Sequence, residues 1–543
     1  MSDPASPVFG HNPAGTSGDD ALNDKVFSSL LAWVDLQAGR DAMVQWKDGA
    51  PASRFFRDVA NSHLVLRGSG QGRGIRATRT TQDAPSRVLA AIPPNALMTV
   101  TSARDKRRSD PLASLLKAEP KKSKKGKGKG AAEPAAPISN HTIVVAHVMC
   151  ELSKLEASFW WPYLATFPAR RDARVGALWW DDAVLVGSPS LFEHVQSLRA
   201  RESASRAEAR ALFGRGKGRM RVVDKGCGGG QDTGGGGGGW WGGASFDEAF
   251  DDAAALVLSR SASLPHARGG DDPASDGDWG SAEVMTPLLD LLNHRSGAGR
   301  YMLLAASGGS DLGFGILAPP DGELAAGDEV FHDYEGGAAA AAAGEGAGNM
   351  GAGNEFGDVG CAHEFLAAYG FLPDGDGGGD GEDSDDARAC ALLPWVGVVR
   401  LRDVAAGSGS KLLELCRGNV PIKPRIEAAS PADVSAEGPP TTLAEALRWE
   451  IDHDLKVLEA LLEADPAGPD GEGPDGKGPD GGACRAAGTC DDSTVASFTS
   501  AADGDEGALL SVRALLARRV AVGEMKVLRA LQAACSPPLE AQA

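Results

Sequence analysis

The chain of 543 residues is long enough for two or three domains, and its 42% hydrophobic residues suffice for buried cores. Its formal net charge of −20 argues against a protein that coats nucleic acid. No run of about 20 apolar residues occurs, so we expect no membrane span. The eight cysteines form no C-x-x-C pair, which argues against a structural zinc site, and we expect no metal.

The spacing of apolar residues predicts strands, then helices, then strands again between residues 22 and 372. The predicted helices span 22–37, 141–155, 191–213, 245–260 and 361–369, and Gly370 ends the last one. The predicted strands span 63–67, 73–78, 87–92, 301–305, 313–318 and 328–334.

Low-complexity segments fall between these elements and cannot build a core of their own. They cover 117–137, 214–243, 266–280, 335–360, 373–386 and 464–493. Surface loops tolerate such insertions, because doubling a flexible loop costs only about 0.6 kcal/mol.

Residues 388–536 differ in pattern from the part before them. Strand signals become rare after about 402, and two long amphipathic patterns at 441–463 and 506–533 predict helices. We therefore predict a separate all-α domain over 388–536.

A dense glycine run, Gly70-Gln71-Gly72-Arg73-Gly74, leads into a predicted strand. It does not match the dinucleotide-binding fingerprint, because Ile75 stands where the third glycine is required. Glycine does allow the backbone to approach a ligand closely, although a plain turn would give the same pattern.

Further motifs follow this glycine run at long intervals. They are Leu258-Ser259-Arg260-Ser261, the run from Pro287 to Asn293-His294, the run from Gly327 to Tyr334, and Tyr369-Gly370-Phe371. In this order they resemble the SET-domain protein methyltransferases, in the branch that includes the Rubisco large-subunit lysine methyltransferase. Three of the chain's 4 tyrosines fall at positions that the resemblance assigns to the active centre.

The resemblance implies an α+β fold in which a SET-domain β-scaffold with a pseudoknot spans 59–372. An N-terminal helical segment, 1–58, precedes it, and a helical insertion occupies about 103–260. The all-α region at 388–536 would then be the substrate-binding domain of this branch, and the segment from Phe159 to Leu164 resembles part of the family's helical insertion.

The same resemblance implies S-adenosylmethionine as the cofactor and assigns site residues. Those expected at the cofactor are Gln71, Gly72, Arg73, Arg260, Asn293 and His294. Tyr334 would be catalytic, and Tyr301, Tyr369 and Phe371 would line the channel for the substrate lysine. Each of these residues also has a purely structural interpretation. Arg260 would be a surface cation, Asn293-His294 would satisfy local backbone groups, and the tyrosines would be ordinary core residues.

Methyl transfer from a sulfonium to an amine requires the neutral amine. Deprotonating a lysine of pKa near 10.4 at pH 7 costs roughly 4–5 kcal/mol, and an apolar channel lowers that cost. Alignment of the reacting atoms then supplies about 7–11 kcal/mol, so no metal is required. A branch of the family that modifies histidine has other residues at the positions of Leu289, Ala262 and Tyr369, so lysine is the expected target.

Departures from the family pattern keep another function open: Gln71 replaces an acidic residue, and Ala362, preceded by Cys361, replaces an asparagine. One alternative is a catalytically inactive SET scaffold that binds protein through the helical C-terminal domain. Another is a chromatin- or RNA-associated protein acting through Lys117 to Lys129 and the glycine-rich tract near Arg215 to Arg221, although the acidic total makes nucleic acid an unexpected partner.

We expect a monomer whose partner is a non-histone protein that carries the target lysine. The first 25 residues are acidic and lack arginine, which favours cytoplasm or nucleus over chloroplast.

Overall fold

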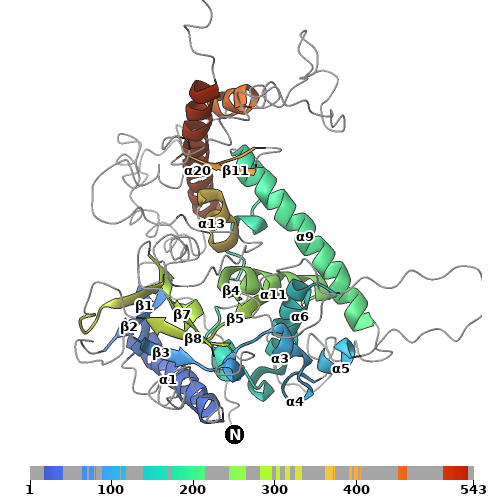
Figure 1. The fold of residues 1–543 in the computed structure, drawn as a ribbon, viewed down its shortest axis with the longest axis vertical. Helices are drawn as coiled ribbons and strands as arrows, with labels where there is room; N and C mark the ends of the chain where they lie inside the picture. Colours follow the sequence, from blue (N-terminus) through green and yellow to red (C-terminus); the bar gives the residue numbers. More distant parts are fainter. Residues whose placement is uncertain are drawn as a thin grey trace, which may run out of the picture. The chain divides into compact units, whose positions relative to one another are not determined.

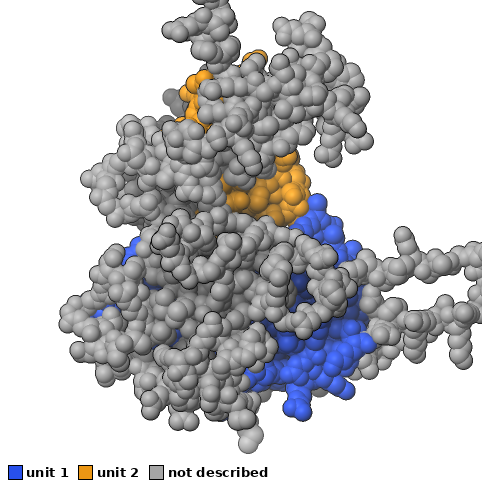
Figure 2. Space-filling model, viewed as in Figure 1, with its two compact units in different colours: residues 1–175, 199–359 blue, residues 176–198, 360–543 orange. Residues whose placement is uncertain are grey.

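The computed structural model describes part of the chain in detail. Its described ranges are 17–40, 64–69, 72–78, 88–110, 112–117, 138–168, 173–186, 188–214, 244–264, 282–295, 301–305, 312–317, 324–332, 361–370, 390–393, 397–400, 451–460 and 506–535, with single residues 80, 372, 401 and 404. Two compact units divide the chain: unit 1 holds 1–175 and 199–359, and unit 2 holds 176–198 and 360–543 (Figure 2).

Unit 1 contains three small sheets. One joins β1 (Leu64–Ser69), β2 (Gly72–Ala77), β9 (Glu329–His332) and β6 (Asn293–His294) in that order; the second joins β3 (Val88–Ile92), β8 (Leu312–Leu317) and β7 (Tyr301–Ala305); the third is β4 (Ser261–Leu264) with β5 (Ala282–Met285). The predicted strands are confirmed to within two residues at each end, and β4 to β6 are additions to them.

Helices occupy the sequence between β3 and β4 (Figure 1). They are α3 (Val100–Arg104), α4 (Lys106–Ser109), α5 (Leu112–Leu116), α6 (Asn140–Lys154), α7 (Trp161–Leu164), α9 (Pro189–Gly214) and α11 (Phe246–Arg260), with short 3-10 turns η2 (Pro94–Ala96) and η3 (Leu155–Ala157). A further turn, η6 (Leu289–Leu291), follows β5, and the N-terminal α1 (Ser17–Arg40) packs on β1. The helices predicted at 22–37, 141–155, 191–213 and 245–260 are confirmed.

The core of unit 1 lies where α6 and α11 pack together. Trp160, Tyr163, Phe167 and Phe250 are fully buried there. The start of α11 is fixed by a capping box, in which Ser245 and Glu248 satisfy each other's backbone N–H groups. This box sets the register of α11, whose last residue is Arg260.

Unit 2 contains the 3-10 turn η5 (Ala177–Trp179), α8 (Asp182–Leu185), α13 (Ala362–Tyr369), the hairpin β10 (Cys390–Leu393) and β11 (Gly397–Arg400), a helix over 451–460, and α20 (Glu506–Cys535). The left-handed Gly370, with φ of 76°, ends α13 as predicted. Unit 2 includes residues 176–198 and 361–370. Both ranges fall inside the domain that the sequence predicted over 59–372.

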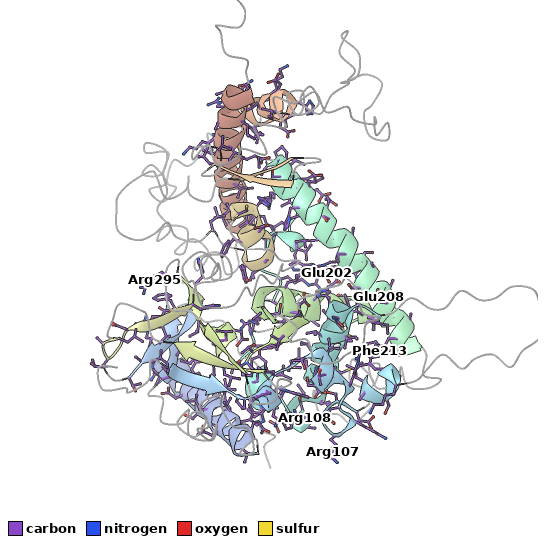
Figure 3. The ribbon with its side chains drawn as sticks, in the orientation of Figure 1. Arg107, Arg108, Glu202, Glu208, Phe213 and Arg295 are labelled. Atoms are coloured by element: carbon purple, nitrogen blue, oxygen red, sulfur yellow. The ribbon has the colours of Figure 1, made fainter. Side chains whose placement is uncertain are left out.

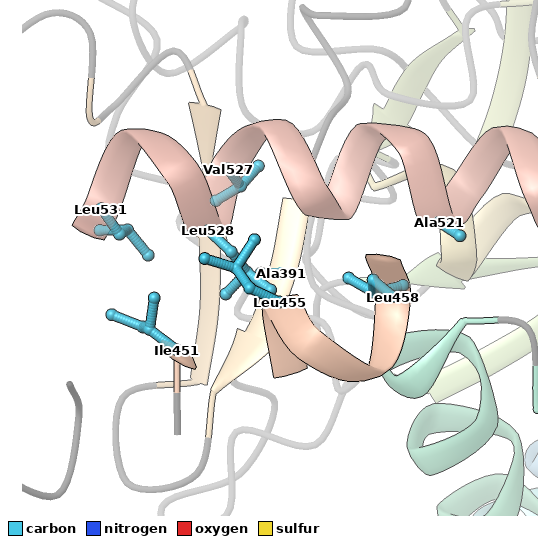
Figure 4. Packing of buried hydrophobic residues seen from close by; sticks show 8 residues of the cluster. All are labelled: Ala391, Ile451, Leu455, Leu458, Ala521, Val527, Leu528 and Leu531. Carbon is cyan, nitrogen blue, oxygen red and sulfur yellow. The ribbon is translucent and has the colours of Figure 1, made fainter. Parts of the chain in front are cut away.

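Leucine and valine side chains of 451–460 and α20 interlock to form the core of unit 2 (Figure 4). Ile451, Leu455 and Leu458 of the first helix cluster with residues of α20, where Leu455 lies beside Leu528 and Leu458 lies toward Ala521 (Figure 4). Ala391 of the β10–β11 hairpin belongs to the same cluster. A prediction of an all-α region over 388–536 is therefore not confirmed, because the hairpin contributes a buried residue to this core. The strand that holds Ala391 is four residues long, which is too short to distinguish a strand from part of a helix by periodicity.

In the part of the chain that the structure describes, no helix combines the length and the apolar character that crossing a bilayer requires.

Glu524 of α20 is hydrogen-bonded to Ser188 and Ser190, at the start of α9. Its buried carboxylate accepts hydrogen bonds from Ser188 Oγ at 2.9 Å, from Ser190 N at 3.1 Å and from the Ser190 hydroxyl. Backbone N–H groups in the first turn of a helix favour such a carboxylate. Burial nevertheless raises the pKa of Glu524 to about 7.

Glu524→Gln should change how the stability of the chain depends on pH. The wild-type carboxyl binds its proton more tightly folded, with a pKa of about 7, than unfolded, with a pKa of 4.5. The free energy of unfolding should therefore fall as pH rises through this window, by on the order of 3 kcal/mol. Urea titrations from about pH 5 to 8 should show a much smaller fall in E524Q.

Glu459 provides the matched control, because it is exposed and pairs with Arg529 at 3.1 Å in the same unit. E459Q should keep the wild-type pH dependence, since exposed pairs contribute little. A fall in E524Q as steep as that of the wild type would contradict the assignment.

Candidate cofactor and active site

Strand β9 brings the glycine run and the Asn293-His294 pair together. Its antiparallel partner is β2, with Ile75 opposite Val330, and its parallel partner is β6, with Asn293 opposite Phe331. The segment before β9 is held as well, because Gly327 N donates to Ala77 O at 2.7 Å and Ala77 N donates to Asp328 O at 2.8 Å. Two motifs more than 200 residues apart in sequence therefore flank one strand.

Gly74 lies so close to two neighbouring side chains that they would have to move to admit a Cβ. A Cβ at this position would lie 2.2 Å from Glu329 Oε1 and 2.7 Å from Asn293 Nδ2. These two atoms are themselves joined, because Asn293 Nδ2 donates to Glu329 Oε1 at 2.6 Å. Gly74 therefore presents bare backbone to the Asn293–Glu329 pair, as the glycine run predicts.

Glu329 is a site residue that the sequence analysis missed. Besides accepting from Asn293, its carboxylate lies 3.8 Å from the guanidinium of Arg76. The sequence signal for it was its place in the Gly327-Asp328-Glu329 run, at the start of the strand predicted over 328–334.

A second cluster is built around the buried carboxylate of Asp290 in η6. Tyr163 Oη of α7 donates to Asp290 Oδ2 at 2.9 Å, and Arg260 Nη1 donates to the same oxygen at 3.3 Å and to Asp290 O at 3.3 Å. Leu288, with φ of 69°, makes the sharp turn that admits Asp290 to this place. Three separate elements thus meet at one carboxylate.

Electrostatics at this cluster follow from burial. Burial raises the pKa of Asp290 to about 6, while Arg260 lowers it. Burial and the neighbouring Asp290 raise the pKa of Tyr163 well above 10, so its phenol remains a donor. Asp290 Oδ1 is buried and has no hydrogen-bond partner among the described residues.

Arg260 is not a surface cation at a helix end. Its side chain is 18% exposed, pairs with Asp290, and places its guanidinium 5.4 Å from the centre of the Phe167 ring. Within the described ranges, only Nη1 has a hydrogen-bond partner. The other guanidinium N–H groups thus remain for a further acceptor, and a carboxylate is the acceptor that they suit best.

His294 is buried and pairs through its backbone with His332 of β9, and Arg295 N donates to His332 O at 3.2 Å. The backbone of this segment thus pairs with a strand distant in sequence, and its contact with a cofactor stays a prediction. The Asn293 side chain is engaged separately, because its Nδ2 donates to Glu329 Oε1.

The remaining predicted residues are placed only in part. Gly72 and Arg73 pair with Ser69 and Gly68 in the β1–β2 ladder, and Tyr301 pairs with Ile316 in β7–β8. Tyr369 is the last residue of α13 in unit 2, with its ring 5.7 Å from that of Phe365. Three further predictions, Gln71, Tyr334 and Phe371, lie outside the described residues.

One group among the described residues has ligand atoms close enough to suggest a metal: Cys361, His363 and Glu364. However, Cys361 is disulfide-bonded, so its sulfur is not a thiolate ligand. Glu364 also accepts a hydrogen bond from Cys361 N at 3.2 Å, which is the geometry of a helix cap. We interpret this group as the start of α13.

Comparison with known proteins gives similarity in structure but not in sequence. No protein-family model and no curated protein matches the chain. The structure is similar to a solved structure described as the SET domain of LSMT bound to lysine and AdoHcy, at 13% identity, covering 94% of this chain and 90% of that chain with a TM-score of 0.42. It is also similar to a structure described as Rubisco LSMT bound to AdoMet, at 13% identity, covering 94% and 91% with a TM-score of 0.40.

Gly74→Ala should destabilise unit 1, because the added methyl group must displace the Glu329 carboxylate from Asn293. We expect a loss of about 1–3 kcal/mol in the free energy of unfolding, measured by urea titration. In a Glu329→Ala background the same substitution should cost less, since the nearest obstructing atom is gone and the Asn293 amide, no longer bonded to Glu329, can turn aside.

The matched control is Gly214→Ala, because a Cβ at Gly214 meets nothing within 4 Å. G214A should leave stability nearly unchanged. Equal costs for G74A in the wild-type and E329A backgrounds would rule out the proposed close contact.

Proposed function

We propose that this chain transfers a methyl group from S-adenosylmethionine to the side-chain amine of a lysine in a non-histone protein. The proposal rests on the order of the sequence motifs and on the way in which their described members converge. The observation that carries it is the contact geometry at Gly74, which puts the backbone of the glycine run against Asn293. The resemblance assigns both segments to one cofactor pocket.

In this proposal Arg260 binds the carboxylate of the cofactor. Its Nη1 is fixed by Asp290, and Tyr163 donates to the same carboxylate oxygen, Oδ2, of Asp290. The planar guanidinium is thereby oriented before the ligand arrives, and its remaining N–H groups can donate two parallel hydrogen bonds to a carboxylate. The backbone of Gly72, Arg73, Asn293 and His294 would line the rest of the pocket, together with Gln71.

Tyr334 would place its hydroxyl near the methyl group that is being transferred. Tyr301, Tyr369 and Phe371 would surround the aliphatic part of the substrate lysine. An aromatic channel disfavours the ammonium form and so makes the neutral nucleophile more available. The transfer forms a carbon–nitrogen bond, breaks a carbon–sulfur bond, and releases one proton from the nitrogen.

Arg260→Lys should weaken the binding of S-adenosylmethionine while leaving the fold intact. Lysine keeps the positive charge but lacks the flat fork of donors, so we expect a loss of about tenfold in affinity by titration calorimetry. Arg210→Lys is the matched control, because Arg210 pairs with Asp247 in an exposed part of unit 1. Equal affinities of R260K and R210K would remove Arg260 from the cofactor site.

Tyr334→Phe should abolish most of the methyl transfer. The assay combines the full chain with cofactor labelled on the methyl group and an extract of cells that lack this protein, and mass spectrometry identifies the methylated lysines. We expect the wild type to label at least one protein that Y334F labels far more weakly, with similar thermal unfolding of the two chains.

Calorimetry with S-adenosylmethionine separates this proposal from the inactive scaffold. Measurable binding together with Tyr334-dependent labelling supports the enzyme. If the wild type neither binds the cofactor nor labels more protein than Y334F does, the enzyme is excluded and the scaffold is favoured.

A further inference from the structure

A largely buried histidine contacts side chains from two other elements of unit 1. His141 lies in the first turn of α6, and its Nδ1 is 2.6 Å from Glu283 Oε2 of β5. On the other side of the ring, Nε2 is 2.8 Å from Glu202 Oε1 of α9. The three side chains are only 10%, 9% and 3% exposed, in that order.

The contacts define the charge of this histidine. Both ring nitrogens face carboxylate oxygens, so both must donate, and the ring is an imidazolium. Burial alone would lower the pKa of His141, but Glu283 and Glu202 outweigh it and raise the pKa to about 10. Arg201 lies 3.4 Å from Glu202 and offsets part of the remaining negative charge. A metal would require one of the nitrogens that these carboxylates already occupy.

Glu283 connects this cation to the segments that carry the candidate site. It lies opposite Ser263 in the β4–β5 ladder, and β4 starts directly after Arg260. Beyond Met285, which pairs with both Ser261 and Met98, the chain leads through the strained Leu288 to Asp290. The two partners of the Arg260–Asp290 pair therefore both extend from the β4–β5 ladder.

We propose that His141 and Glu283 are positioning residues for the cofactor site, because their ion pair fixes the β4–β5 ladder from which Arg260 and Asp290 extend. This inference rests on the proposed function. Neither residue touches the reacting atoms. Both act by limiting the positions open to the Arg260 guanidinium before the cofactor binds.

Glu208 of α9 gives a matched control, because it also binds the first turn of α6. It lies on α9 near Glu202 (Figure 3), and its carboxylate accepts from Ser139 N at 2.9 Å and from Thr142 Oγ1 at 2.7 Å. Among the described residues, the hydrogen-bond partners of Glu208 are Ser139 and Thr142, and neither lies on β5. Glu208→Gln therefore loosens α6 against α9 without releasing Glu283.

The test uses the full chain and compares Glu283→Gln with Glu208→Gln in two measurements. Hydrogen exchange followed by mass spectrometry should show faster exchange over 286–295 in E283Q only. Calorimetry should show S-adenosylmethionine affinity about tenfold weaker in E283Q and unchanged in E208Q. E283Q affinity should also fall further between about pH 7 and 9, where the wild type stays flat, because His141 has lost one of its two carboxylates.

If E283Q does not fold, Glu202→Gln replaces it and should show the same dependence of affinity on pH. Equal exchange rates and equal affinities in E283Q and E208Q would overturn the inference. If wild type fails to bind S-adenosylmethionine while E283Q still speeds exchange over 286–295, the proposed function fails and the control of this segment by Glu283 stands.

Discussion

The buried carboxylate of Asp290 is the interaction on which the candidate site depends. It receives the phenol of Tyr163 and the guanidinium of Arg260, and so it joins α7, the end of α11 and η6. Burying a charge away from water costs free energy unless the charge is paired. Removing any one partner would leave the others buried without compensation, which explains why three distant segments must fold together here.

The packing of the strands also positions the candidate site. Glycine at position 74 lets β2 pass directly against Asn293 and Glu329, and β9 holds β2 on one edge and β6 on the other. The imidazolium of His141 then steadies the β4–β5 ladder at its far side. Three interactions thus hold residues 286–295 in place: the close approach of Gly74, the Arg260–Asp290 ion pair, and the His141–Glu283 ion pair through the β4–β5 ladder.

Much of unit 1 could be predicted from sequence, because periodicity is a local signal. The spacing of Val144, Val148 and Leu152 gave α6, and the left-handed Gly370 ended α13 as expected. What sequence could not give were partners distant in the chain, such as Tyr163 with Asp290 or His141 with Glu283. Nor could it show Ala391 entering the core of unit 2, since a hairpin of four-residue strands carries little pattern.

The most direct test of the account is a crystal structure of the full chain with S-adenosylhomocysteine. The account predicts the ligand's carboxylate on the guanidinium of Arg260, with its adenine against the backbone of Asn293 and His294. A ligand bound elsewhere in the chain, with Arg260 still held only by Asp290, would contradict it.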